Sequence, residues 1–146
     1  MLTWAIQRVG YADEHVDQQG TTDVDAFLLA FDAFPWVEQN NQWDETQDGP
    51  MAALILQNEA DKRKLWITAL ASDEKLNDSY FIAVEWTAPR KSLFGFGQIK
   101  MVEETAAFSM VGRPNTEQLC RLFCDSRYEE FDRQIAEWVR RDRDGD

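Results

Sequence analysis

The sequence is poor in the residues that build disulfide scaffolds, metal sites and redox sites. It contains two cysteines, Cys120 and Cys124, and one histidine, His15, in 146 residues. Two cysteines on one helical pattern are badly placed for the narrow geometry of a disulfide, so we expect reduced, buried thiols. No second Cys or His pair accompanies them, which argues against a zinc site. We expect no metal and no other cofactor.

Long hydrophobic runs are also missing. The first fifteen residues, MLTWAIQRVGYADEH, lack the charged start, apolar core and small-residue cleavage site of a secretion signal. No later segment is apolar for long enough to cross a bilayer. These features predict a cytoplasmic protein that has no membrane partner.

Basic residues are scarce, above all in the first part of the chain. The net charge is -12, and residues 1–61 contain twelve acids against one base, Arg8, which places -11 there and leaves -1 on the other 85 residues. Such a field disfavours nucleic acid and anionic membranes and attracts a basic protein surface. The alternative is that the acidity only keeps the chain soluble. Its uneven distribution leaves both interpretations open.

Catalytic motifs are equally sparse. His15 lies in a polar stretch, where a flexible loop would hold a catalytic imidazole badly. The segment FGFG, Phe94 to Gly97, lacks the remaining spacing and the lysine of a phosphate-binding loop, and predicts a hairpin or bulge instead. Arg90 and Lys91 precede it, but two cations in so acidic a chain do not make a nucleic-acid site.

Pairs of neighbouring acids are the remaining candidates for metal binding or acid–base chemistry. Each pair has an ordinary role at a helix start, a turn or a solvated face, and none has a convincing partner elsewhere in the chain. The sequence therefore indicates a protein that is not an enzyme. The pairs are Asp23/Asp25, Glu103/Glu104 and Glu129/Glu130.

What the chain does contain is enough apolar material for a core. Hydrophobic residues make up 44% and aromatics 12%, with six Trp and nine Phe. At this length one hydrophobic core is the usual outcome, so residues 1–146 are interpreted as a single domain. Alternation over Leu2–Ile6 predicts a first strand, and the polar segment YADEHVDQQGTT after it predicts a surface loop.

From Thr22 the spacing becomes helical. Val24, Phe27, Leu28, Phe31 and Phe34 form one apolar stripe, and Thr22 or Asp23 can cap its start. Pro35 cannot continue the helix, so the helix is expected to stop or kink there. A new turn carrying Trp36, Val37 and Gln39 can follow, before NNQWDETQDGP returns the chain to a polar loop.

The middle of the chain predicts strands in close succession. Short connections favour antiparallel neighbours. Two strands are expected after FGFG, separated by a tight acidic turn near Glu104. The strand segments are MAALILQ, KLWITALA, SYFIAVEWT, GQIKMVEE and TAAFSMVG.

The last 32 residues predict a broken helix. Ser126 followed by Glu129 matches a capping box, so we expect a break near Asp125, a second helix after it and a frayed arginine-rich end. The whole pattern indicates an α+β fold. An antiparallel sheet of four to six strands would carry an N-terminal helix and a broken C-terminal helix.

Six segments follow one another along the chain: FDAFPWVEQ, GPMAALILQ, KLWITALA, YFIAVEW, LFGFG and LFCDSRYEEF. Their order resembles small bacterial immunity proteins of polymorphic, contact-dependent or type VI secreted toxins. The resemblance covers Ala26 to Phe131 and rests on structural motifs. It implies a cytosolic protein that docks on its cognate toxin domain, usually over or beside the active site, and neutralises it. It transfers no contact residue, because such proteins vary most where they touch their toxin.

FDAFPW itself is interpreted as structural, since Phe31 and Phe34 continue the buried stripe. The partner surface is then predicted around it, with Trp43 as an aromatic anchor among acids; burial of Trp43 in the core is the equal alternative. The candidate partner-binding residues are Asp32, Glu38, Trp43, Asp44, Glu45 and Asp48.

Three functions remain open at this stage. The first is an immunity protein whose acidic surface occludes a basic toxin domain. The second is a secretion adaptor or chaperone that holds an apolar segment of an effector. The third, a small carboxylate-dependent hydrolase, is the weakest, because no acid pair has a partner.

Overall fold

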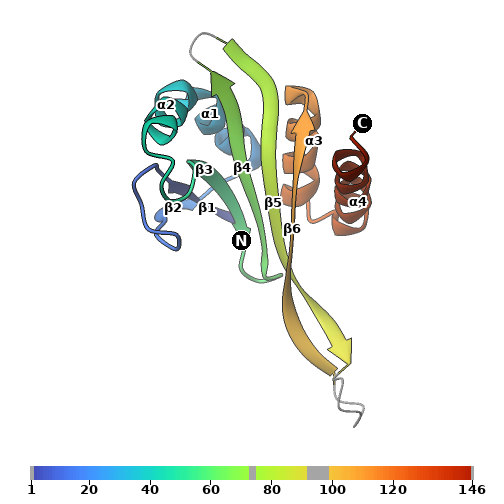
Figure 1. Ribbon diagram of the computed structural model, residues 1–146. Coiled ribbons are helices and arrows are strands. Elements are labelled where there is room, and N and C mark those ends of the chain that lie inside the picture. Colours follow the sequence, from blue (N-terminus) through green and yellow to red (C-terminus); the bar gives the residue numbers. More distant parts are fainter. Residues whose placement is uncertain (1, 73–74, 92–98, 146) are drawn as a thin grey trace.

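The protein is described here by a computed structural model that covers residues 2–72, 75–91 and 99–145. Its elements alternate between strands and pairs of helices (Figure 1). They are β1 (Leu2–Gln7), β2 (Asp17–Thr21), α1 (Val24–Ala33), α2 (Trp36–Thr46), β3 (Ala53–Asn58), β4 (Arg63–Ser72), β5 (Lys75–Lys91), β6 (Ile99–Val111), α3 (Arg113–Cys124) and α4 (Tyr128–Asp144).

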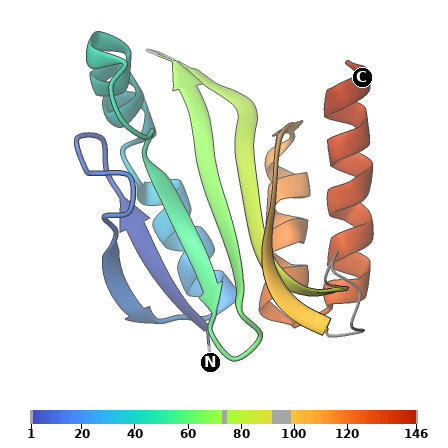
Figure 2. The same ribbon diagram turned by 60° about the horizontal axis from the view of Figure 1, so that its bottom comes forward.

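The strands form one antiparallel sheet in the order β2-β1-β3-β4-β5-β6. Its faces differ along β5, where Ile82 and Val84 are buried and the preceding Phe81, on the opposite face, is 43% exposed. Helices α1, α3 and α4 cover the first face, and α2 lies against one end of the strands (Figure 2). The predicted α+β fold with four to six antiparallel strands is confirmed.

The core lies between this sheet face and the helices. Phe27 of α1 is fully buried and meets Trp4 of β1 edge-on, with ring centroids 5.9 Å apart. On the other side of the core, Phe123 of α3 and Phe131 of α4 meet at 5.6 Å. Burial of such rings contributes about 1.5 to 3 kcal/mol each. The helices are therefore held mainly by apolar contact.

Helix α1 begins and ends where its sequence predicts. The carboxylate of Asp23 accepts a hydrogen bond from the backbone N–H of Ala26 at 2.8 Å, so Asp23 is the cap. Phe34 is already extended, because Pro35 follows it. The indole of Trp36 then folds back and donates to the carbonyl of Phe31 at 2.8 Å. The interpretation of FDAFPW as structural agrees with this burial.

The expected surface loop after β1 was wrong in part, because Asp17–Thr21 forms β2. Four of its five residues are exposed, so it shows no apolar alternation. It pairs with β1 through its backbone, with Gly20 opposite Trp4. Because this pairing uses backbone groups, it does not require an apolar side-chain pattern, and an exposed edge strand carries little sequence signal.

The polar loop predicted from Asn40 onward was also wrong, because α2 continues to Thr46. Asn40 is buried, and its side-chain amide donates to the carbonyl of Ala69 in β4 at 2.8 Å. Trp36 and Trp43 complete the inner side of the helix at helical spacing. Because the polar Asn40 occupies a core position, the sequence does not show the apolar spacing by which this helix could have been predicted.

The two strands predicted around Glu104 are one strand, β6, paired with β5 from Ser79 opposite Val111 to Lys91 opposite Ile99. Glu104 does not turn the chain because a long partner strand supports it. The two strands continue past the helices as a ribbon (Figure 1), and Met101, Val102 and Glu103 of β6 are exposed, so acids are tolerated along this part of the strand. The hairpin or bulge predicted for Phe94 to Gly97 lies outside the described residues.

The C-terminal helix is broken after Cys124, as predicted, but the capping box is wrong. Ser126 is left-handed (φ 56°), and its N–H bonds the carbonyl of Phe123, while the N–H of Arg127 bonds that of Leu122. This is a Schellman ending, so Ser126 closes α3 and Arg127 starts α4 without a side-chain cap.

The predicted fraying of the arginine-rich end is wrong too, because α4 stays helical to Asp144. Glu137 pairs with Arg140 and Arg141, and Arg140 also reaches Asp144 at 3.3 Å. Such pairs one turn apart support an exposed helix end. Earlier in the same region, Cys120 is buried and Cys124 is half-buried, and both are free thiols, as expected.

Two adjacent leucines test which face α1 presents to the core. Leu28 is 6% exposed and Leu29 is 74% exposed. Leu28→Ala should lower the free energy of unfolding by about 2 to 5 kcal/mol, because it leaves a cavity. Leu29→Ala should change it by about 0.5 kcal/mol or less. Denaturant unfolding measures both, and equal losses would contradict the packing described for α1.

Candidate functional site

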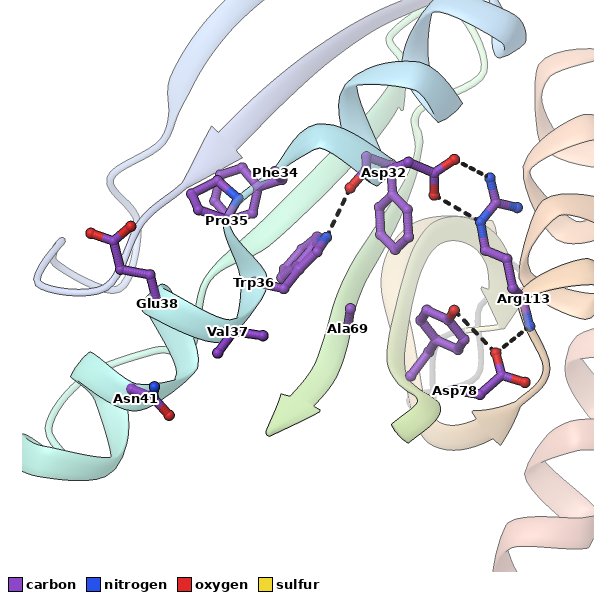
Figure 3. A pocket seen from close by; sticks show the side chains of 12 residues that line it. Asp32, Phe34, Pro35, Trp36, Val37, Glu38, Asn41, Ala69, Asp78 and Arg113 are labelled. Atoms are coloured by element: carbon purple, nitrogen blue, oxygen red, sulfur yellow. Dashed lines mark hydrogen bonds and ion pairs between the residues drawn. The ribbon is translucent and has the colours of Figure 1, made fainter. Parts of the chain in front are cut away.

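A cleft of about 820 Å³ opens where α1 ends and α2 begins, against the ends of β4 and β5 and the start of α3 (Figure 3). Its floor is aromatic and its rim carries carboxylates. The lining residues are Phe31, Asp32, Phe34, Pro35, Trp36, Val37, Glu38, Asn41, Ala69, Asp78, Tyr80 and Arg113.

The floor follows from the break at Pro35. Because α1 cannot continue, Trp36 returns toward the helix it has left, with its ring centroid 5.1 Å from that of Phe31 and 4.6 Å from that of Phe34. Tyr80 of β5 joins the group 6.0 Å from Phe31. All four rings are largely buried, so they present a fixed apolar base.

One wall is an ion-pair network centred on Arg113, the first residue of α3. Its guanidinium binds both carboxylate oxygens of Asp32, at 3.0 and 2.8 Å, and reaches Glu117 at 3.3 Å. Its backbone N–H donates to Asp78 at 2.8 Å. The hydrogen bond to Asp32 is the main reason why the pKa of Arg113 is raised. This network joins α1, α3 and the strand β5.

Tyr80 connects the floor to that wall. Its hydroxyl lies 3.3 Å from the Asp78 carboxylate, the oxygen that also accepts the Arg113 N–H. Burial, reinforced by the negative charge of Asp78, raises the pKa of Tyr80 to about 12. The hydroxyl is therefore protonated at neutral pH and serves as a hydrogen-bond donor.

The opposite wall is the first turns of α2. Val37 adds apolar surface, while Glu38 is exposed at the outer rim and Asn41 follows one turn later. Together the lining residues carry three carboxylates and one guanidinium, and that guanidinium is already engaged. The cleft is therefore an acidic rim around an apolar floor.

Of the predicted partner-binding residues, the structure brings Asp32 and Glu38 to this cleft. Asp44 and Glu45 lie further along α2, and Asp48 follows its end, all three exposed. Trp43 is half-buried against the core, and its indole donates to the carbonyl of Gly49 at 3.0 Å. Trp43 is thus neither fully buried in the core nor a fully exposed anchor, and its part in partner binding stays a prediction.

Two of the side chains that the sequence suggested for catalysis or metal binding make stacking contacts or ion pairs. His15 stacks on Tyr11 with centroids 4.2 Å apart, and its Nε2 lies 3.7 Å from Asp17. Asp25 pairs with Arg121 at 3.2 Å. In residues 2–72, 75–91 and 99–145 no cluster of three or more His, Cys, Asp or Glu side chains is arranged to hold a metal.

Sequence reasoning missed Asp78, Tyr80 and Arg113. Asp78 lies in β5 beside Ser79, and Arg113 follows the end of β6, so the two residues meet because Ser79 pairs with Val111. No spacing along the chain reports such a meeting, since it depends on the register of two strands. A signal for Tyr80 did exist, because its hydroxyl had to find a partner once the strand was buried.

Comparison with protein-family models, curated proteins and solved structures found no match to this chain. None of the described helices has the length and apolar character needed to cross a membrane. The site is therefore interpreted from its own geometry.

Tyr80 should give the stability of the protein a distinct dependence on alkaline pH. In the unfolded chain its pKa is about 10, whereas in the folded protein it is about 12. The raised value means that the unfolded state loses the proton first, so stability is intact below pH 10 and falls as the pH rises toward 12. Denaturant unfolding at several pH values should show a shallower fall for Tyr80→Phe. Parallel curves for the two proteins would refute the assignment.

Proposed function

We propose that this chain is an antitoxin-type immunity protein that binds a secreted toxin domain in the cytoplasm and blocks its active site. The observation that carries the proposal is the uncompensated acidity of α2 and the turn after it. Helix α2 holds Glu38, Asp44 and Glu45 and contains no basic residue. Asp48 extends the same acidic surface beyond the helix.

The acids of the neighbouring helix α1 differ, because the protein neutralises them itself. Asp25 pairs with Arg121 and Asp32 pairs with Arg113, both cations coming from α3. Within the described part of the chain, the acids of α2 have no ion-pair partner. The arginines of α3 therefore offset the charge of α1 but not that of α2. We call Glu38, Asp44, Glu45 and Asp48 the α2 surface.

An exposed acidic surface supports inhibition of a basic protein in particular. Toxins that attack nucleic acids carry basic substrate grooves, and opposite charge can raise the association rate to about 10⁸ M⁻¹ s⁻¹ or more at low salt. Apolar contact at the centre of the interface then slows dissociation. The α2 surface borders such an apolar centre, the cleft floored by Trp36.

A second function, an adaptor for an effector's apolar segment, is supported by the uncovered sheet face. Phe81 and Val111 are 43% and 59% exposed there. Such side chains favour contact with an apolar partner. An adaptor would hold its effector without inhibiting it, which separates the two functions experimentally.

Capture followed by a protection assay tests the proposed function. The tagged protein is recovered from its native cells, washed at high salt, and the stoichiometric partner is identified by mass spectrometry. That partner's toxic domain is then expressed alone in a susceptible host, with and without this chain. An immunity protein restores growth. Binding without protection would reject the proposal and support the adaptor.

Charge reversal on α2 should slow association with that partner. We expect Asp44→Lys, Glu45→Lys and Asp48→Lys together to lower the association rate by about tenfold or more at low salt and to weaken its salt dependence. The dissociation rate should change less, because these exposed side chains lie at the rim. Stopped-flow or surface-based kinetics measure both rates.

The matched control carries three reversals away from α2, at Glu59, Glu103 and Glu129. These side chains are exposed, and no ion pair of theirs is found in the described residues. The total charge change is the same in both variants. Equal slowing would mean that net charge, and not the α2 surface, steers the partner.

A further inference from the structure

We infer that the cleft beside α2 binds one arginine or lysine side chain inserted by the protein partner. This inference rests on the proposed function. The cleft joins an apolar floor to an acidic rim within about 820 Å³. Long basic side chains have the matching build, an aliphatic stem that packs on apolar surface and a cationic head that seeks carboxylates.

The floor suits the stem because it is apolar and fixed. Phe31, Phe34, Trp36 and Tyr80 are each less than a tenth exposed, and the Trp36 indole N–H is already bonded to the Phe31 carbonyl. The Trp36 indole N–H therefore does not need a hydrogen-bond acceptor from a ligand. Because the floor is preformed, its own side chains lose little conformational entropy when a ligand side chain binds.

The rim suits the head because its negative charge is in excess. Arg113 is the lining cation, and its guanidinium is held by both oxygens of Asp32 and by Glu117. The charge of Asp32 is thereby offset, whereas Glu38 and Asp78, on opposite sides of the cleft, add further negative charge. An entering cation therefore meets a net negative field, and an anionic ligand is repelled.

The same arrangement favours a protein side chain over a nucleic acid or an acidic peptide. Phosphates would have to approach Glu38 and Asp78, and the guanidinium of the lining residue Arg113 is already bound to Asp32. The cleft also adjoins the α2 surface, so a basic partner steered onto Glu45 or Asp48 would bring its side chains to the cleft mouth.

Titration with a single basic side chain tests the inference directly. The probe is the capped peptide acetyl-Gly-Gly-Arg-Gly-Gly-amide, added to the full ¹⁵N-labelled chain. Saturating shifts are expected for the backbone amides of Trp36, Val37, Ala69 and Tyr80. The same peptide with citrulline, which is nearly isosteric but neutral, should bind about tenfold more weakly, because it lacks the charge that strengthens such hydrogen bonds.

Two single-residue variants test whether the rim carboxylate of Glu38 contributes to peptide binding. Glu38→Gln should weaken arginine-peptide binding by about fivefold, as expected for an exposed charge. Glu129→Gln on α4 removes the same charge far from the cleft and should leave the affinity unchanged. Glu38 and Glu129 are both exposed, so unfolding curves should match those of the wild type. Equal affinity for citrulline, or shifts that spread over other surfaces, would overturn the inference.

The two proposals fail separately. If the peptide misses the cleft while the α2 reversals still slow the partner, the inference about the cleft is lost and the immunity function stands. If the peptide binds the cleft but the captured partner's toxicity is unaffected by this chain, the immunity function is lost and the cleft remains a seat for basic side chains.

Discussion

The break at Pro35 is the constraint on which the candidate site depends. Without it, the apolar stripe of α1 would run on past Phe34, and Trp36 would project from a different side of the helix than Phe31 instead of folding back onto it. The proline removes one backbone donor and forces Phe34 to be extended. A chain that turns in this way leaves a hollow beside the turn, and the ends of β4 and β5 close its base.

Electrostatics then distinguish two acidic helices that look alike in the sequence. Both α1 and α2 carry acids and no base, yet only α1 packs near α3, whose Arg113 and Arg121 reach Asp32 and Asp25. Exposed pairs of this kind add little to stability, because water and salt screen them. Their larger effect is on the field, because they cancel the charge of α1 and leave that of α2.

Much of the fold could be predicted from the sequence, since it follows from periodicity and breakers. The stripe from Phe27 to Phe31, the stop at Pro35 and the break after Cys124 are all local signals. The failures share a different cause. β2 is exposed and α2 buries the polar Asn40, so neither has the expected alternation of apolar residues. The wall of the cleft at Asp78 and Arg113 was missed because these residues meet only through the register of β5 and β6.

The strand order also determines how the chain can assemble its sheet. From β3 to β6 every strand pairs with the next one along the sequence, so each step closes a short connection. The exception is β1, which pairs with β3 across both helices of the N-terminal half, Trp4 opposite Leu56. Closing that long loop carries the largest entropic cost among these pairings. The cleft draws its lining from both sides of that long connection, with Phe31 and Trp36 before β3 and Ala69 and Tyr80 within β4 and β5. It is therefore complete only when the N-terminal helices and the β3–β6 meander are folded against each other.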